Sequence, residues 1–155
     1  MQPFPRKIRV DVPAQRLQVL ENDRIMAEFP VSTSARGLGS EPGSFKTPFG
    51  RFTVGAMIGD GAPLGAIFKS RVPTGELGPL ESPGGEDDFV QTRILWLEGA
   101  EPHNANTRDR YIYIHGTNHE ERIGEPCSHG CVRMRNADVA ELFTLIEPGT
   151  EVFIG

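Results

Sequence analysis

The chain has 155 residues, of which 37% are hydrophobic and 24% charged, so it is long enough to bury a core and too apolar for a disordered chain. Its 16 Lys and Arg against 21 Asp and Glu give a net charge of −5, and no basic block for nucleic-acid binding is present. The apolar runs are too short to span a bilayer, and the N-terminus lacks the apolar core of an export signal. We expect a single domain over residues 1–155, in which 18 glycines and 13 prolines favour strands joined by turns.

Alternation of apolar and polar residues predicts strands at the start of the chain. Ile8, Val10 and Val12 alternate with charged residues, which is the period of a half-buried strand. Residues 16–20 and residues 25–31 alternate in the same way. Because polar turn residues separate them, we predict that they form a hairpin.

The middle of the chain is richer in loops. Residues 32–44 are small and polar and are predicted to be a loop, whereas residues 46–52 turn into a strand that runs through Val54. A short strand is predicted at residues 66–72. Residues 73–88 are rich in Pro, Gly and acidic side chains and are predicted to be a mobile surface loop.

The last part of the chain contains the strongest strand and helix patterns. Strands are predicted at residues 89–98 and 111–115, with a polar loop at residues 102–109 between them. A helix is predicted to begin near Asn136, which we expect to cap it, and to end at Pro148-Gly149. Its apolar face consists of Val139, Leu142, Phe143 and Ile146.

A final strand at residues 151–154 completes the predicted fold. The fold class is therefore mainly β and sandwich-like, with one main helix after a loop that contains a cysteine.

One stretch concentrates the groups needed for nucleophilic catalysis. The strand at residues 111–115 ends on His115 and Gly116, and a later loop presents Cys131 directly after Gly130. A histidine near a cysteine can take the thiol proton, and glycine-flanked amides can stabilise an oxyanion. Two alternatives remain open on local grounds: Cys131 could be a buried, unreactive thiol, and His115 could only terminate a strand.

A second cysteine, Cys127, leaves further alternatives. A disulfide between Cys127 and Cys131 would silence a nucleophile, and it would require a tight turn. A zinc site is also conceivable, although no pair of CxxC motifs is present. Its potential ligands are Cys127, Cys131, His115, His119 and His129.

Two segments of this stretch resemble the signature of the L,D-transpeptidase catalytic-domain family. They are His115-Gly116-Thr117-Asn118 and Ser128-His129-Gly130-Cys131-Val132-Arg133-Met134. The opening hairpin, a Thr-Pro-x-Gly-x-Phe turn at residues 47–52 and the closing strand are similar to the family as well, so the resemblance covers nearly the whole chain.

The resemblance implies a role for each matching position, with no metal and no cofactor. Cys131 is expected to be the nucleophile, His115 its general base, and the Gly116 carbonyl the group that orients His115. The oxyanion hole is expected from the amides of His129, Gly130 and Cys131. The substrate-binding residues are expected to be Ser128, His129, Arg133, Thr117 and Asn118.

The implied reaction is transpeptidation on peptidoglycan stem peptides. Cys131 would attack the bond before the terminal D-alanine of a tetrapeptide, and an amine would then take the acyl group from the thioester. Two alternatives are an L,D-carboxypeptidase, in which water takes the acyl group, and a non-catalytic peptidoglycan-binding domain. Carbapenems are the expected inhibitors. The family's substrate implies the periplasm or cell envelope, whereas the missing export signal leaves the cytoplasm open.

Overall fold

A computed structural model describes residues 5–80 and 87–155 and has the mainly β fold predicted from the sequence. The strands are β1 (Arg6–Asp11), β2 (Arg16–Glu21), β3 (Arg24–Ser32), β4 (Gly50–Ile58), β5 (Ala66–Lys69), β6 (Val72–Leu77), β7 (Val90–Gly99), β8 (Tyr113–Gly116), β9 (Val132–Met134) and β10 (Glu151–Ile154). The helices are η1 (Pro102–Asn104), η2 (Arg108–Arg110), η3 (Glu120–Arg122) and α1 (Asn136–Leu145).

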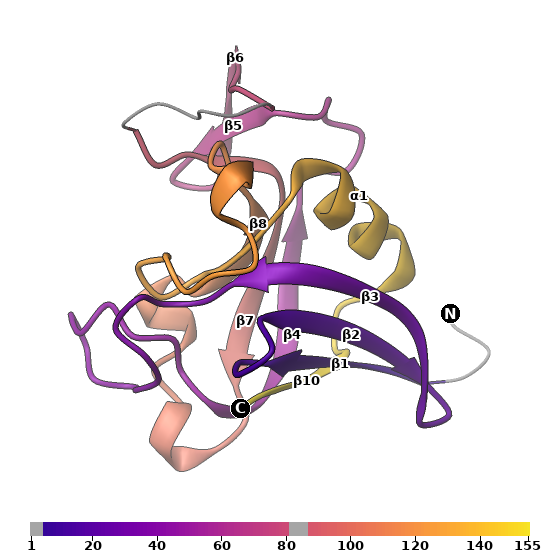
Figure 1. Cartoon of the computed structure of the whole chain (residues 1–155), viewed down its shortest axis with the longest axis vertical. Helices are drawn as coiled ribbons and strands as arrows, with labels where there is room; N and C mark the ends of the chain where they lie inside the picture. The colour runs from indigo at the N-terminus through magenta and orange to yellow at the C-terminus, as the bar shows by residue number, and fades with distance from the viewer. Residues whose placement is uncertain (1–4, 81–86) are drawn as a thin grey trace.

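The described strands form one sheet in the order β4-β10-β1-β2-β3-β9-β8-β7-β5-β6, and β4 also pairs with β7. This extra pairing curls the sheet around, so that β1, β2 and β3 cross the view in Figure 1 while β4 and β7 run along it. The β5–β6 hairpin projects from the top, beyond the curled part of the sheet (Figure 1).

The opening hairpin is confirmed as β2 and β3. Asn22 and Asp23 join the strands with φ values of 52° and 61°, which is the left-handed backbone that a tight hairpin turn requires. Asn and Asp tolerate this conformation better than other non-glycine residues. The register shifts between Val19 and Leu20, and beyond this shift Leu17 and Val19 are buried in the core.

Strands β7, β8 and β9 separate two hydrophobic clusters, because successive residues on a strand face opposite sides. The larger cluster, against which α1 packs, includes Leu95, Leu97, Ile114, Val132, Met134, Val139 and Leu142. The smaller cluster consists of Ala66, Phe68, Ile94 and Tyr113, with Trp96 and Cys131 packed against it. The cysteine singled out in the sequence therefore lies on the face away from α1.

The predictions for residues 66–72 and 73–88 are wrong in part. The strand predicted at 66–72 is divided by a turn into β5 and the start of β6, and β6 occupies the first part of the predicted loop. All six residues of β6 are exposed, so no apolar alternation marks the strand. Residues 81–86 of the predicted loop lie outside the described part of the chain.

Three other boundaries differ from the prediction. Tyr111 lies before β8 and has a left-handed backbone at the end of η2. The two short helices η1 and η2 interrupt the predicted polar loop. Asn136 is the first residue of α1 and not its cap, since the extended Arg135 is at the cap position and the Asn136 side chain donates to the Thr117 carbonyl instead. Ile146 follows the end of α1, although it is buried as predicted.

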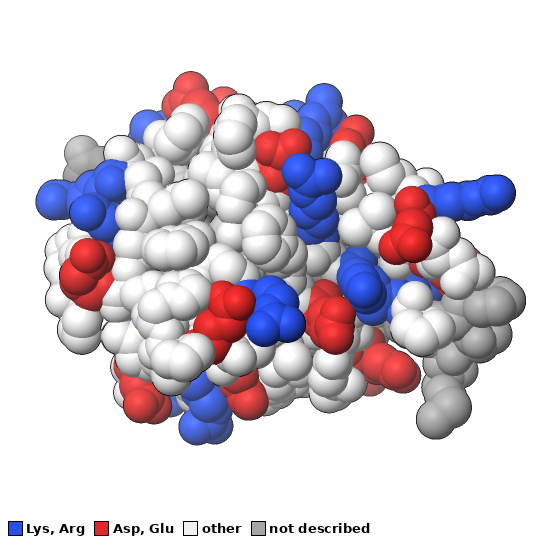
Figure 2. Space-filling model, turned by 90° about the horizontal axis from the view of Figure 1, so that it is seen from below, with Lys and Arg blue, Asp and Glu red and all other residues white. Residues whose placement is uncertain are grey.

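Basic and acidic side chains are interspersed on the lower face of the molecule, as Figure 2 shows. Ion pairs on the surface join Lys7 to Glu151 and Arg51 to Glu101. In the described residues, no helix combines the length and apolar character needed to cross a membrane.

Candidate active site

The site is built on two parallel neighbouring strands. In β8 and β9, His115 pairs with Arg133 and Ile114 with Val132. One residue nearer to the strand starts, the Tyr113 amide donates to the Cys131 sulfur. All four side chains therefore face the side away from α1. On the other edge of β8, Ile94 lies beside His115 and Trp96 beside Tyr113. The fold thus makes the predicted base and nucleophile diagonal neighbours on one face.

His115 is held in one orientation and in its neutral form. Its Nδ1 lies 2.6 Å from the carbonyl oxygen of Gly116, which can only accept, so Nδ1 carries the proton and Nε2 keeps its lone pair. Only 3% of the residue is exposed, and this burial lowers the pKa of the imidazole to about 4. At neutral pH, His115 is therefore a base with a free lone pair on Nε2.

Gly116 packs too closely against its neighbours for any larger residue. A Cβ at this position would lie 2.6 Å from the backbone oxygen of Gln91 and 2.6 Å from the side-chain oxygen of Asn136. Asn136 in turn donates to the Thr117 carbonyl at 2.8 Å and accepts from Thr92 at 2.6 Å. This buried network therefore fixes the carbonyl that orients His115.

A bulge in β7 contributes to that network. The register with β8 shifts between Gln91 and Ile94, and Thr92 has a φ of 74°, which is unusual for a β-branched residue. The Thr92 hydroxyl is buried between the Gly65 amide, which donates to it, and Asn136. Backbone strain of this kind is found where a structure must aim a functional group.

Cys131 is a neutral thiol in this structure. Its sulfur accepts from the Tyr113 amide at 3.3 Å and donates to the Tyr111 carbonyl at 3.4 Å. Burial, the largest cause, raises the pKa of the thiol to about 11. Both Cys131 and His115 are described, and no hydrogen bond joins them. The resting site thus contains a thiol and a neutral imidazole, not the thiolate–imidazolium pair.

The loop before Cys131 is fixed by short polar contacts. Gly130 has a φ of 126°, which favours glycine, and its carbonyl accepts from Thr47 Oγ1 at 2.9 Å. Ser128 is buried, donates to the Cys131 carbonyl at 2.6 Å and accepts from the Gly130 amide at 3.3 Å. The Thr47-Pro48 turn therefore braces the cysteine loop. One amide predicted for the oxyanion hole, that of Gly130, is bonded to Ser128 here.

Arg133 is buried in an ion pair that the sequence did not reveal. Its side chain is 5% exposed, and Nη2 lies 2.7 Å from Oδ2 of Asp88. Asp88 also lies 3.4 Å from Nδ1 of the exposed His129. The Asp88 charge acts on the site. It adds to the effect of burial in raising the pKa of Cys131, and it opposes the larger effect of burial, which lowers the pKa of His115. Asp88 is therefore a site residue that was predicted only as part of a surface loop.

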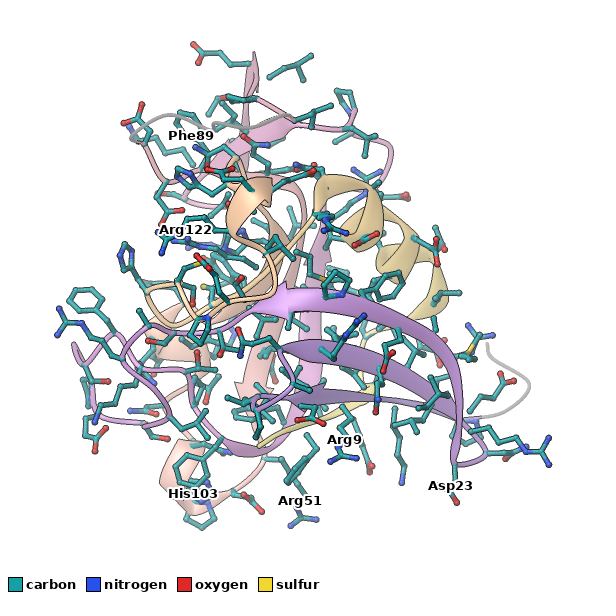
Figure 3. The ribbon with its side chains drawn as sticks, viewed as in Figure 1. Arg9, Asp23, Arg51, Phe89, His103 and Arg122 are labelled. Atoms are coloured by element: carbon teal, nitrogen blue, oxygen red, sulfur yellow. The ribbon has the colours of Figure 1, made fainter. Side chains whose placement is uncertain are left out.

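Asn118 explains how Asp88 reaches the site. Its amide nitrogen donates to the Asp87 carbonyl at 2.7 Å, and its oxygen accepts from the Phe89 amide at 2.9 Å. Phe89 lies above Arg122 on the left of Figure 3, whereas Arg51 and His103 lie at the opposite end of the molecule. Thr117, also buried, accepts from the His119 amide at 3.1 Å. Both residues thus make internal bonds that hold the site together.

Cys127 makes contacts that differ from those of Cys131. Both cysteines are free, and Cys127 contacts the Arg122 carbonyl at 3.9 Å and Arg133 at 3.8 Å. The disulfide alternative is therefore not realised in this structure. The described residues contain no group of three or more His, Cys, Asp or Glu side chains able to hold a metal ion.

A groove of about 570 Å³ leads away from Asp88. It runs between the β5–β6 hairpin and residues 87–90, and Lys69, Thr74 and Glu76 line its hairpin side. Its volume is within the range of pockets that bind small ligands. Since Asp88 belongs both to this groove and to the ion pair with Arg133, the groove adjoins the site.

Comparisons with known proteins agree with one another. Residues 5–154 match the family model for the L,D-transpeptidase catalytic domain. A Bacillus subtilis protein designated L,D-transpeptidase YkuD is 28% identical over 151 residues, covering 97% of this chain and 66% of the relative. Escherichia coli YbiS, also designated an L,D-transpeptidase, is 37% identical over 78 residues, which are 50% of this chain and 22% of the relative.

Solved structures have the same fold. An L,D-transpeptidase from Mycobacterium smegmatis has a TM-score of 0.63 at 19% identity, over 98% of this chain and 59% of that one. L,D-transpeptidase 3 from Mycobacterium tuberculosis, solved with a faropenem-derived adduct, has a TM-score of 0.62 at 16% identity, over 97% of this chain and 60% of that one. The chain thus spans less than two thirds of the length of these relatives.

Proposed function

The chain belongs to the L,D-transpeptidase catalytic-domain family, and from this premise we propose that it is a peptidoglycan L,D-transpeptidase with Cys131 as nucleophile and His115 as base. The observation that carries the proposal is the shared face of β8 and β9. There, a buried neutral imidazole with a free Nε2 lies diagonally from a thiol. We also propose that residues 1–155 act as one catalytic domain in the cell envelope, where the substrate lies.

Acylation begins when the thiol leaves its bond to the Tyr111 carbonyl and turns toward His115. Nε2 takes the proton while the sulfur attacks the carbonyl that precedes the terminal D-alanine. The amides of His129, Gly130 and Cys131 stabilise the oxyanion, which requires the Gly130 amide to exchange its bond to Ser128 for one to the substrate. The imidazolium then protonates the leaving D-alanine, and a thioester remains.

The thioester is resolved by an amine in the proposed reaction. The amine of another stem peptide, of a free D-amino acid or of an anchored protein attacks the thioester carbonyl and loses its proton to His115. The carbon–sulfur bond breaks, and the Cys131 sulfur takes this proton back to restore the thiol. Ser128 shapes this loop through its bonds to residues 130 and 131, and Asn118 and Thr117 hold the neighbouring segments. Arg133 and His129 act on the substrate region through Asp88.

Intact mass spectrometry after treatment with a carbapenem tests the nucleophile. The sulfur should open the lactam ring, so the mass should rise by one whole inhibitor molecule in wild type and in Cys127→Ala, but not in Cys131→Ala. Cys127→Ala is the matched control, because it removes the neighbouring free thiol. An adduct that persists in Cys131→Ala would rule out the assignment.

Product analysis separates the transpeptidase from its alternatives. With a tetrapeptide and excess D-methionine, the proposed enzyme should exchange the terminal D-alanine for D-methionine. Release of the tripeptide alone, despite excess amine, would instead identify an L,D-carboxypeptidase. A protein that binds the tetrapeptide, forms no carbapenem adduct and releases nothing would be a non-catalytic peptidoglycan-binding domain.

A further inference from the structure

Arg71 lies in the turn of the β5–β6 hairpin, where its backbone has an unfavourable conformation. Ser70 and Arg71 have φ values of 50° and 66°, and neither is a glycine. Two left-handed residues match the twist of a hairpin, but glycine, Asn or Asp usually occupies these positions. A serine and an arginine at this turn indicate that the Arg71 side chain has a use that offsets the strain.

An aromatic cradle beside the thiol holds the guanidinium of Arg71. Its Cζ lies 4.8 Å from the ring centre of Trp96 and 5.0 Å from that of Tyr111, and Nη1 donates to the Tyr113 hydroxyl at 3.0 Å. Cation–π contacts with two rings and one hydrogen bond fix the position of the guanidinium.

Two of these three aromatic residues also contact the nucleophile. The Tyr111 carbonyl accepts from the Cys131 sulfur, and the Tyr113 amide donates to it. The backbone of Tyr113 thus lies against the thiol, while its hydroxyl lies against Arg71. One tyrosine side chain therefore sets the separation between the nucleophile and the cation.

The charge of Arg71 has no carboxylate partner within residues 5–80 and 87–155. By contrast, Arg133 pairs with Asp88 at 2.7 Å, and Arg108 pairs with Glu98 at 3.8 Å. A guanidinium has five N–H donors, and Tyr113 takes one of those on Arg71. The remaining donors of this partly exposed side chain can form a bidentate pair with a carboxylate.

We propose that Arg71 binds a free carboxylate of the donor peptide and thereby positions the scissile carbonyl at Cys131. This specificity role rests on the proposed function, because it requires a peptide acid beside the thiol. The buried Arg133 is already paired inside the protein, so Arg71 takes the role of the carboxylate anchor. The carboxylate comes either from the terminal D-alanine or from the side chain of the third stem residue.

Binding to Cys131→Ala protein tests the proposal without turnover. Three tetrapeptides are titrated and followed by NMR: the free acid, its C-terminal carboxamide, and the form amidated on the third-residue side chain. Amidation of the carboxylate that Arg71 binds should weaken binding relative to the free acid. The amidated peptide that binds more weakly therefore identifies the source of the carboxylate. When Arg71→Gln is combined with Cys131→Ala, the Kd of the free acid should rise by about ten- to hundredfold. The Kd of the amidated peptide that binds more weakly should hardly change. Arg71→Lys should keep part of the preference.

Arg108→Gln is the matched control, because the Arg108 guanidinium lies 4.5 Å from the same Trp96 ring and is already paired with Glu98. It should keep the wild-type preference for the acid. A purely structural role of Arg71 would weaken acid and amide binding alike. If the Arg71→Gln variant still distinguishes the free acid from the two amidated peptides as well as the protein with Arg71 does, the proposal is overturned. Discrimination in binding with no turnover by the wild type would instead overturn only the proposed enzymatic function.

Discussion

The neutral state of His115 makes the stability of the protein depend on pH. In the folded protein, burial lowers the pKa of His115 from 6.5 to about 4. As the pH falls below 6.5, the His115 imidazole binds a proton in the unfolded chain but stays neutral in the folded protein. Stability is therefore lost between pH 6.5 and pH 4 and is unaffected by this group above that window. At about 1.4 kcal/mol per pH unit, the loss amounts to about 3 kcal/mol.

Urea unfolding at a series of pH values between 7.5 and 4 measures this contribution. His115→Gln removes the titrating group, so the stability difference between wild type and variant should shrink by about 3 kcal/mol from pH 7 to pH 4. Because all other groups titrate in both proteins, their contributions cancel in the difference. His103→Gln, which removes a partly exposed histidine far from the site, is the matched control.

A stability difference that stays constant with pH would refute the reasoning. It would mean that the folded protein protonates His115 as readily as the unfolded chain does. The imidazole would then be charged when the pH is moderately acidic, and the assignment of Nε2 as a free base would lose its physical basis.

Two further predictions concern the neighbours of the proposed nucleophile and base. Asp88→Asn removes a charge that raises the pKa of Cys131, so the thiol should be alkylated by iodoacetamide about three- to tenfold faster at a fixed pH, whereas Asp87→Asn should not change the rate. Equal rates in both variants would contradict this role of Asp88. Gly116→Ala introduces a Cβ 2.6 Å from a backbone oxygen and should shift the carbonyl that orients His115. Carbapenem acylation should slow on the order of a hundredfold, and an unchanged rate in a folded variant would show that the orientation is unimportant.

The opening hairpin and the cysteine loop were predictable because their determinants are local. Polar turn residues lie between two alternating segments, and the turn they form is the one that the Asn22-Asp23 pair favours. The proposed base and nucleophile were also identifiable, since each lies beside a glycine that the backbone requires. Gly130 has a left-handed φ, and Gly116 has no space for a side chain.

The partners of these residues come from distant parts of the chain and carry no local pattern. Asp88 reaches Arg133 because Asn118 holds the segment from Asp87 to Phe89. Strand β9 has only three residues and exists because β3 and β8 flank it. Residues in such positions are determined by the tertiary fold, so the periodicity of the sequence cannot reveal them.

The resting charge of the site follows from these distant partners and bears on selectivity. The histidines that precede Cys131 in sequence, His115 and His129, suggest an activated thiolate, but burial and the negative charge of Asp88 both raise the pKa of Cys131. The thiol is therefore protonated at neutral pH and reacts slowly with small electrophiles. A substrate that places its carbonyl in the oxyanion hole and its carboxylate on Arg71 brings the carbonyl carbon to the sulfur, so the loss of the thiol proton to His115 is accompanied by formation of the carbon–sulfur bond. Proton transfer to His115 then becomes favourable only when the correct peptide is bound, which couples activation of the nucleophile to recognition of the substrate.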